Sequence, residues 1–227
     1  MKKVLTIVLV MCLAFCSVFA EKGKAEVGVV MGYAEEFFQM EYSLSDYSYK
    51  FVGLQPGFNI TGTAAYGITD DVSLKAEVGV TLYGKLKTQI TVNGINGEPE
   101  IASEATPMNF NFYVGGEYEI EFSRGLAVCA GLGADIMMGK QTCADNETSN
   151  TRIGLGFEAI AKYAINKNLN VSFGGRFAVH FVNTGDKTTA SLPYAIDQMQ
   201  KWVDTFGGTF SRFQGAFRVF AGVTYSL

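Results

Sequence analysis

The sequence has few of the residues that build metal sites, disulfide frameworks or nucleic-acid surfaces. It contains one histidine and four cysteines in 227 residues, and two of the cysteines, Cys12 and Cys16, fall within the first twenty positions. One histidine and two distant cysteines cannot supply a zinc site, so we expect no metal and no cofactor. The 18 basic residues are outnumbered by 22 acidic ones and form no cluster, which argues against nucleic acid as a partner.

Beyond residue 20 the chain lacks any apolar stretch approaching the ~18 residues of a membrane-spanning helix. The first twenty residues are typical of a cleaved export signal. Lys2 and Lys3 precede an apolar run over 4–15, and a cleavage site with small residues ends at Ala20. We therefore predict a signal peptide over 1–20 and one mature domain over 21–227. Lipidation at Cys16, whose preceding residues resemble a lipobox, is the alternative.

The last fifteen residues of the chain alternate with period two. The face that runs from Phe213 to Leu227 carries no charge, whereas the other face includes Gln214 and Arg218. This pattern predicts a strand with a different solvent on each side. Fifteen extended residues reach roughly 50 Å, more than the ~9 to 11 tilted residues that cross a bilayer. Seven further segments repeat the pattern, at 25–33, 58–66, 72–82, 110–120, 126–136, 153–163 and 169–181.

Eight alternating segments predict an all-β fold, an eight-stranded antiparallel up-and-down transmembrane β-barrel that follows the N-terminal signal peptide. The connections between segments are of two kinds. Tight turns rich in Asp, Asn, Gly and Ser are expected at 68–71, 122–125 and 165–168, and long loops at 34–57, 84–107, 139–152 and 183–209. Short turns at one rim and long loops at the other are typical of bacterial outer-membrane barrels, with both termini in the periplasm.

Alternation alone does not identify the face that points into the barrel. In a soluble barrel of the lipocalin type the apolar set would be buried. Here the apolar faces are almost uninterrupted, and Tyr33, Tyr66 and Tyr118 lie near strand ends, as in an interfacial girdle. The opposite faces are rich in glycine and small residues. We therefore expect the apolar faces to contact outer-membrane lipid.

The eight segments, the signal-like start and the ending Gly222-x-x-Tyr225-x-Leu227 carry a family resemblance. The chain resembles the small outer-membrane barrels of the OmpA, OmpX and OmpW type. The resemblance implies that the barrel assembly machinery is a partner, and that Gly222, Tyr225 and Leu227 are the assembly signal. The family signal usually ends in phenylalanine, whereas this chain has Leu227.

The inward faces carry many ionisable residues. In an eight-stranded barrel the lumen is just wide enough for side chains, so opposite charges are expected to pair across it, because an unpaired buried charge is costly. One interpretation is a polar core that holds the strands in register. The other, implied by the resemblance to the salt-bridged lumen of OmpA-type barrels, is a gated ion or proton path. The expected lumen charge network consists of Lys75, Glu77, Glu117, Glu119, Asp135, Glu158, Lys162, Arg176 and Arg218.

A helix is predicted in the last long loop, over 191–206. Ser191 can cap it, Pro193 suits its first turn, and apolar residues recur at helical spacing before Gly207 and Gly208. Its apolar stripe and two aromatic residues of the first loop would meet at the barrel mouth. Packing among the loops is one interpretation, and a pocket for an apolar ligand, implied by the OmpW resemblance, is the other. The expected mouth patch is Phe37, Phe38, Leu192, Ile196, Met199, Val203 and Phe206.

The single histidine, His180, is expected near the outer end of its strand. The stretch His180-Phe181-Val182-Asn183 resembles the His-x-Ser-Asn of PagL-type lipid A deacylases. Val182 stands where that motif has the nucleophilic serine, and valine cannot attack an acyl bond. Cys129 and Cys143 are expected much farther apart than the ~7 Å Cα limit of a disulfide, so we predict two unbridged thiols.

These observations predict a non-enzymatic bacterial outer-membrane protein without catalytic residues. Its lumen would be polar, salt-bridged and largely closed, and its loops would serve structural or surface-interaction roles with a host or surface partner. A narrow channel or uptake protein for small, apolar molecules is the second hypothesis. A deacylase-like enzyme is the third.

Overall fold

The computed structural model describes residues 25–44, 47–103, 108–143, 146–185, 200–201, 204–205 and 208–227. The predicted signal peptide over 1–20 and the alternative lipidation site at Cys16 therefore lie outside the described residues. Residues 200–201 and 204–205 are helical, within the range predicted as a helix. No helix among the described residues has both the length and the apolar character needed to cross a membrane.

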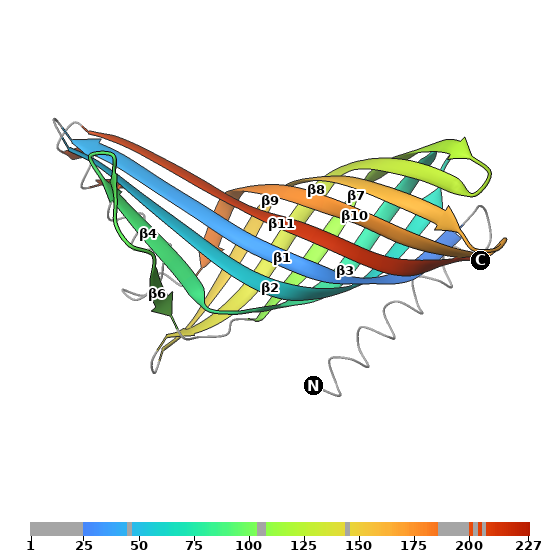
Figure 1. Cartoon of the computed structure of the whole chain (residues 1–227), viewed down its shortest axis with the longest axis horizontal. Coiled ribbons are helices and arrows are strands. Elements are labelled where there is room, and N and C mark those ends of the chain that lie inside the picture. Colours follow the sequence, from blue (N-terminus) through green and yellow to red (C-terminus); the bar gives the residue numbers. More distant parts are fainter. Residues whose placement is uncertain are drawn as a thin grey trace.

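The described residues are almost entirely β-strand, as their alternating side chains predict (Figure 1). The strands are β1 (Ala25–Leu44), β2 (Tyr47–Gly67), β3 (Val72–Tyr83), β4 (Leu86–Val92), β5 (Ile95–Asn96), β6 (Glu100–Ser103), β7 (Met108–Ser123), β8 (Leu126–Cys143), β9 (Asn146–Ala164), β10 (Leu169–Gly185) and β11 (Thr209–Ser226).

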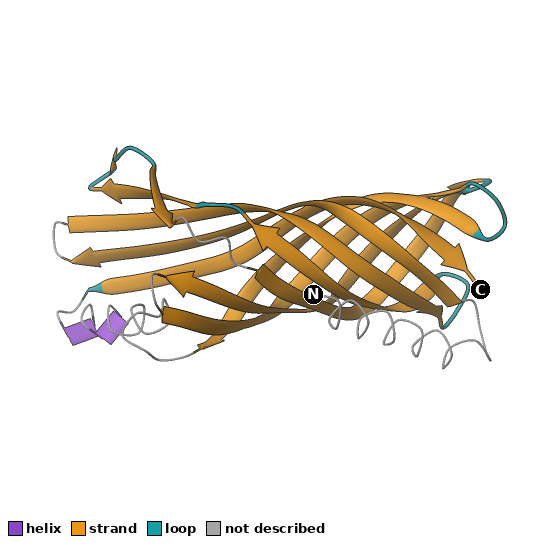
Figure 2. Cartoon of the chain, turned by 90° about the horizontal axis from the view of Figure 1, so that it is seen from below, coloured by secondary structure: helices purple, strands orange, loops and turns teal. Residues whose placement is uncertain are grey.

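Eight of these strands close into a ring. Antiparallel pairing runs through β1, β11, β10, β9, β8, β7, β3 and β2, and β2 pairs with β1 again. The predicted eight-stranded antiparallel barrel is thus confirmed. Residues 68–71, 124–125 and 165–168 form short turns at one end of the barrel, which we call the turn end. The first residue of β1 lies there as well, because the Leu227 amide donates a hydrogen bond to the Ala25 carbonyl over 2.8 Å. Figure 2 shows the strands from a second side.

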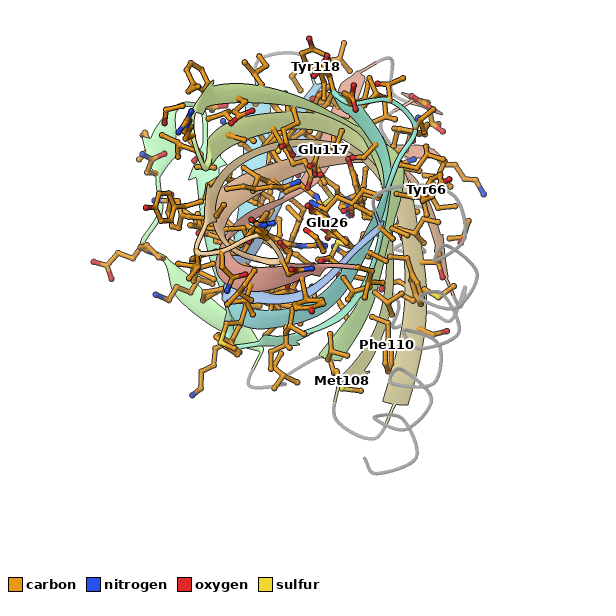
Figure 3. All side chains as sticks on the ribbon, turned by 90° about the vertical axis from the view of Figure 1, so that its right-hand side faces the viewer. Glu26, Tyr66, Met108, Phe110, Glu117 and Tyr118 are labelled. Carbon is orange, nitrogen blue, oxygen red and sulfur yellow. The ribbon has the colours of Figure 1, made fainter. Side chains whose placement is uncertain are left out.

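The interior of the barrel is more polar than its exterior. Among the described residues, 20 buried side chains are polar or charged and 13 are hydrophobic, whereas large apolar side chains such as Val29, Phe157 and Val223 are exposed on the outside. In the view from the turn end, Glu26 and Glu117 lie within the ring and Tyr118 lies outside it (Figure 3). This is the arrangement predicted for a barrel in lipid and the reverse of a soluble barrel.

Two of the four predicted long loops are wrong. The ranges 34–57 and 139–152 are mostly strand, since β1 continues to Leu44 before β2 begins at Tyr47, and β8 continues to Cys143 before β9 begins at Asn146. Alternation continues through these ranges, but the polarity of the two faces changes, which is why the apolar pattern ends before the strands do. The predicted loop over 84–107 contains β4, β5 and β6, and β10 extends into the range 183–209.

The end opposite the turns carries a sheet that extends beyond the ring (Figure 1). Pairing of β10 with β11 ends at His180 and Gln214, whereas β1 pairs with β11 as far as Ser43 and Thr209. Beyond Gly57, β2 pairs with β4 instead of β3. We call this extension the projecting sheet, and it consists of residues 38–44, 47–55, 86–92 and 209–213.

The two faces of the projecting sheet differ in polarity. The face that continues the lumen side of β1 is apolar and aromatic: Phe38 contacts Phe51, with ring centroids 5.4 Å apart, and Tyr42 stacks on Tyr49 at 5.0 Å. We call this the aromatic face. The other face carries Gln39, Glu41, Ser43, Ser48, Lys50, Gln89 and Thr91. The opposite face also carries Val52, Leu54 and Phe213, and Thr88 and Arg212 share the aromatic face, so the exchange of polar and apolar sides relative to the ring is partial.

Candidate functional site in the barrel lumen

The centre of the lumen is occupied by Arg176, which projects inward from β10 and is 2% exposed. Its guanidinium group lies 2.7 Å from Glu77 of β3 and 2.5 Å from Glu158 of β9. Glu158 is on the strand next to Arg176, whereas Glu77 reaches the same arginine from across the ring. Removing either partner would leave a buried charge without its counterion, which is strongly unfavourable.

Asp135 of β8 forms a second centre beside Arg176. Its carboxylate lies 3.7 Å from Arg218 and 3.9 Å from Arg176, and it makes a 3.0 Å hydrogen bond with His180 Nε2. His180 is therefore buried inside the barrel. It is the last residue at which β10 pairs with β11, near the outer end of the ring, and β10 itself continues to Gly185.

Two lysines connect the carboxylates nearer the turn end. Lys75 lies 3.0 Å from both Glu77 and Glu158 and 3.4 Å from Glu117. Lys162 contacts Glu117 at 2.6 Å, Glu119 at 3.1 Å and Glu26 at 3.5 Å. The structure therefore brings all nine residues of the expected charge network together in one lumen.

A further ion pair lies toward the projecting sheet. Arg152 of β9 and Glu36 of β1 are 2.5 Å apart, and the Asn109 amide donates a hydrogen bond to Glu36 over 2.5 Å. Sequence reasoning missed both charged residues because they fell in ranges predicted as loops. Every second residue of β1 points inward, so continuing this alternation past Ala34 would have identified Glu36.

Uncharged polar side chains link the clusters. Arg218 donates to Asn111 over 3.1 Å, and Asn111 donates to Thr81 over 2.6 Å. Asn59 also donates to Thr81, over 2.8 Å, and Thr61 donates to Asn59 over 2.7 Å. These bonds extend the central cluster onto β2 and onto Thr81 of β3.

Two apolar layers pack beside the charged residues, which remain connected past them through Lys75 and Arg176. Val30, Cys129, Ile160 and Phe220 form one, and Ile160 lies between Lys162 and Glu158 along β9. Tyr83, Met137, Ala178 and Ala216 form the other, and Ala178 lies between Arg176 and His180 along β10. A cavity of about 20 Å³ adjoins the first layer and Lys75, Glu117 and Lys162, which is room for a water molecule. Charged, polar and apolar side chains thus occupy the lumen of the described ring at each of these levels.

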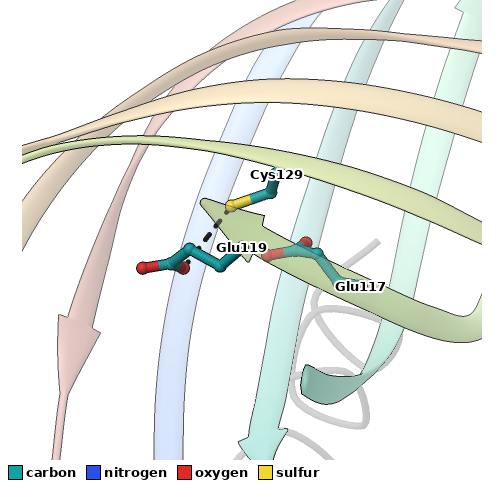
Figure 4. Close-up of side chains that lie close together, drawn as sticks. All are labelled: Glu117, Glu119 and Cys129. Carbon is teal, nitrogen blue, oxygen red and sulfur yellow. Dashed lines mark hydrogen bonds between the residues drawn. The ribbon is translucent and has the colours of Figure 1, made fainter. Parts of the chain in front are cut away.

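Glu117, Glu119 and Cys129 form a candidate metal group, with ligand atoms within 4.8 Å of one another (Figure 4). The Cys129 thiol donates to Glu119 over 3.4 Å. Because the Lys162 ammonium already contacts both carboxylates, this group has its cation and is an ion-pair cluster. Cys129 is a free, buried thiol, and the side chain of Cys143 lies outside the described residues.

The structure separates the two aromatic residues of the expected mouth patch. Phe37 faces outward, where its ring stacks on Phe177 and Phe213 with centroids 5.9 and 5.5 Å apart. Its assignment to the mouth is corrected on this ground, since neighbours along a strand point to opposite faces. Phe38 lies on the aromatic face. The other expected members, Leu192, Ile196, Met199, Val203 and Phe206, lie outside the described residues.

The residues of the expected assembly signal lie at the end of β11. Tyr225 and Leu227 are exposed on the outside of the barrel. Gly222 lies where β11 approaches β1, and a Cβ there would come within 2.2 Å of the Val29 carbonyl oxygen. The close contact between the two strands therefore explains why position 222 is glycine, independently of any role in assembly.

Comparison with known proteins adds the following findings. The model of a family described as "Outer membrane protein beta-barrel domain" matches residues 6–192. No curated protein matches the sequence. Among solved structures, Neisserial surface protein A is 16% identical with a TM-score of 0.51, and the match covers 90% of this chain and 99% of that one.

Two further solved structures show weaker likeness. The N-terminal β-barrel domain of Pseudomonas aeruginosa OprF is 12% identical with a TM-score of 0.46, covering 86% of this chain and 97% of that one. Ail, the attachment invasion locus protein of Yersinia pestis, is 13% identical with a TM-score of 0.44, covering 91% and 99%. At these identities the structural likeness concerns the fold.

Proposed function

Because the chain belongs to the family of outer-membrane proteins with this β-barrel domain, we propose that it is a non-enzymatic surface protein of the bacterial outer membrane. Its barrel serves as a closed anchor and its projecting sheet makes the contacts with a host or surface partner. The turn end, where β1 begins and β11 ends, faces the periplasm, as do both termini of the mature chain. Outer-membrane lipid surrounds the ring, and the barrel assembly machinery inserts it, reading Gly222, Tyr225 and Leu227.

The paired charges of the lumen carry this proposal. Five buried carboxylates pair with five cations along the barrel, and the two apolar layers pack beside them. Opening such a lumen would separate buried ion pairs, each of which is costly to break. If the barrel is closed, the projecting sheet is the element that can bind a host or surface partner.

The projecting sheet supports a role in surface contacts. It joins parts of β1, β2, β4 and β11 into one amphipathic sheet beyond the ring. On its aromatic face, Ile90 and Val92 are 38% and 41% exposed. Apolar residues exposed together in this way are typical of interaction surfaces.

The test is solute leakage from liposomes that contain the purified protein. We expect no leak of small ions from the parent protein or from a variant that lacks 86–103, which shortens the sheet and keeps the ring. Cells that carry this variant should no longer bind the host or surface partner. The amount of the variant in the outer membrane should equal that of the parent protein. A leak through the parent protein would overturn the closed anchor.

A narrow channel is the second candidate, and one observation favours it. Ionisable side chains follow each other from Glu26 at the turn end through Lys162, Glu117 and Lys75 to Arg176. Rearrangement of these pairs would give ions or protons a polar route. Charge reversal by Arg218→Glu should then change the conductance of single proteins in planar bilayers. The same experiment on the parent protein would show no current if the anchor is closed.

Uptake of small apolar molecules is a variant of this second candidate. The separation of β10 from β11 beyond Gln214 and the aromatic face at the mouth favour it. A deacylase-like enzyme is disfavoured. His180 bonds to Asp135, and no serine, threonine or cysteine of the described part of the chain hydrogen-bonds to it. Val182 occupies the position where that enzyme class has serine.

A further inference from the structure

Four strands of the ring end in the same short motif at the turn end. Each of the strands that run toward this end, β2, β7, β9 and β11, carries a tyrosine followed two residues later by isoleucine or leucine. The four copies are Tyr66-Gly67-Ile68, Tyr118-Glu119-Ile120, Tyr163-Ala164-Ile165 and Tyr225-Ser226-Leu227. The strands of opposite direction begin with aliphatic residues instead, such as Val72, Leu126 and Leu169.

The aliphatic members of the motif face outward beyond the tyrosines. Their side chains are exposed, and Phe122, which follows the second copy, is the most exposed of the group at 67%. Phe122 falls where the pairing of β7 with β8 shifts register, between Glu121 and Ser123. We call these residues the lower tier: Ile68, Ile120, Phe122, Ile165 and Leu227.

The turns that hold two lower-tier residues have the same construction. The amides of Ile68 and Ile165 each donate to a carbonyl four residues later, over 2.8 Å. In both turns the side chain of the following residue accepts hydrogen bonds from two backbone amides. Thr69 Oγ1 accepts from the amides of residues 71 and 72 at 3.3 and 3.0 Å, and Asn166 Oδ1 accepts from those of 168 and 169, both at 2.9 Å.

These hydrogen bonds satisfy several backbone groups of the turns, while the exposed charged side chains at the tips, Asp70, Asp71 and Lys167, stay in water. A backbone that satisfies its own polar groups can enter a region poor in water, whereas an open loop cannot. In water, by contrast, five large apolar side chains around one rim would form an exposed hydrophobic collar, which soluble surfaces avoid. Aliphatic side chains held outward on self-satisfied turns therefore match a lipid environment.

We propose that the lower tier is embedded in the bilayer, so that the membrane border at the turn end lies at the turns and not at the tyrosine ring. The occupant of this surface is phospholipid. The four-fold repeat fixes the depth and tilt of the barrel, because each pair of strands contributes one anchor. Depth in turn sets how far the projecting sheet stands above the opposite surface.

Tryptophan fluorescence tests the position of the lower tier directly. Trp202 is the single tryptophan of the chain, so reporters are made in a Trp202→Phe background as Ile68→Trp, Ile165→Trp and the conservative Phe122→Trp. Ile95→Trp, an isoleucine 76% exposed in β5, is the matched control. Each protein is folded into phosphatidylcholine vesicles with or without bromine on the acyl chains.

We expect the lower-tier reporters to lose most of their emission to brominated lipid and to resist iodide in the water. Ile95→Trp should show the reverse. Lower-tier reporters that behave like the control would place the turns in water and overturn the proposal. Phe122→Trp changes one aromatic ring for another, so it gives the reading even if an isoleucine variant fails to fold.

The fourth copy of the motif, which ends at Leu227, is also part of the proposed assembly signal. A second measurement therefore separates contact with lipid from recognition by the assembly machinery. Ile68→Ser with Ile165→Ser should slow folding into vesicles of pure phospholipid, compared with Ile95→Ser. A defect that occurs in cells but not with pure lipid would assign the lower tier to the assembly machinery, and would also overturn embedding as its role.

Discussion

Arg176 lies over the ring of Tyr113 in the centre of the barrel, with its guanidinium carbon 3.7 Å from the ring centroid. Glycines on two neighbouring strands make room for this tyrosine. A Cβ on Gly133 would lie 2.8 Å from a ring carbon, and one on Gly115 would lie 2.6 Å from the hydroxyl. The tyrosine in turn supports the arginine between Glu77 and Glu158, and a desolvated pair of this kind contributes about 2 kcal/mol.

The glycine beneath Tyr113 should therefore not tolerate a methyl group. In Gly133→Ala the new Cβ would also come within 2.5 Å of the Val114 carbonyl oxygen, so backbone must move. We expect the free energy of unfolding from vesicles in urea to fall by about 1–3 kcal/mol. Gly116→Ala is the control, because nothing lies within 4 Å of a Cβ there. Equal stability of the two variants would contradict this explanation.

Breaking the central ion pairs should cost more than replacing them together. Arg176→Met leaves Glu77 and Glu158 buried beside Lys75 alone, and we expect a loss of about 3–5 kcal/mol in the free energy of unfolding. Adding Glu158→Gln to this variant should restore part of the loss, because one uncompensated carboxylate is removed. A double variant less stable than the single one would contradict this explanation. Urea titration in vesicles measures all three proteins.

A charge on the outside of the ring should oppose membrane folding. Val78 lies near the middle of β3, on the face opposite Glu77, and Val78→Arg is expected to destabilise the inserted barrel by about 2–4 kcal/mol. Gln39→Arg, on the polar face of the projecting sheet, should have little effect. The folded fraction in vesicles, read from heat-modified migration in gels, gives the comparison. Equal insertion of both arginine variants would mean that this face does not contact lipid.

The apolar layer next to the water-sized cavity should limit conduction. Phe220→Ala removes a buried ring from this layer, so we expect an ion leak from liposomes that the parent protein lacks. Phe217→Ala makes the same chemical change on the lipid side, where Phe217 is 41% exposed, and should stay closed. If neither variant leaks, the ion pairs alone are sufficient to close the lumen.

Sequence alone determined the strands of the ring and the direction of their side chains. A period of two is a property of the extended backbone, so the apolar face of the segment ending at Leu227 and the inward places of Glu77, Asp135 and Arg218 could be read directly. It did not determine where β1, β2, β8 and β9 end, because the apolar face of each stops before the strand does: β1 and β2 change the polarity of their faces, and β8 and β9 become polar on both.

Only the tertiary structure decided which charges meet. Lys75 and Glu158 are 83 residues apart in the chain yet 3.0 Å apart in the lumen, and His180 reaches Asp135 across 45 residues. Such contacts depend on the stagger with which eight strands close into a ring, and one strand cannot encode the height of a residue on another. The sequence therefore set which side chains point inward, and ring closure set their partners.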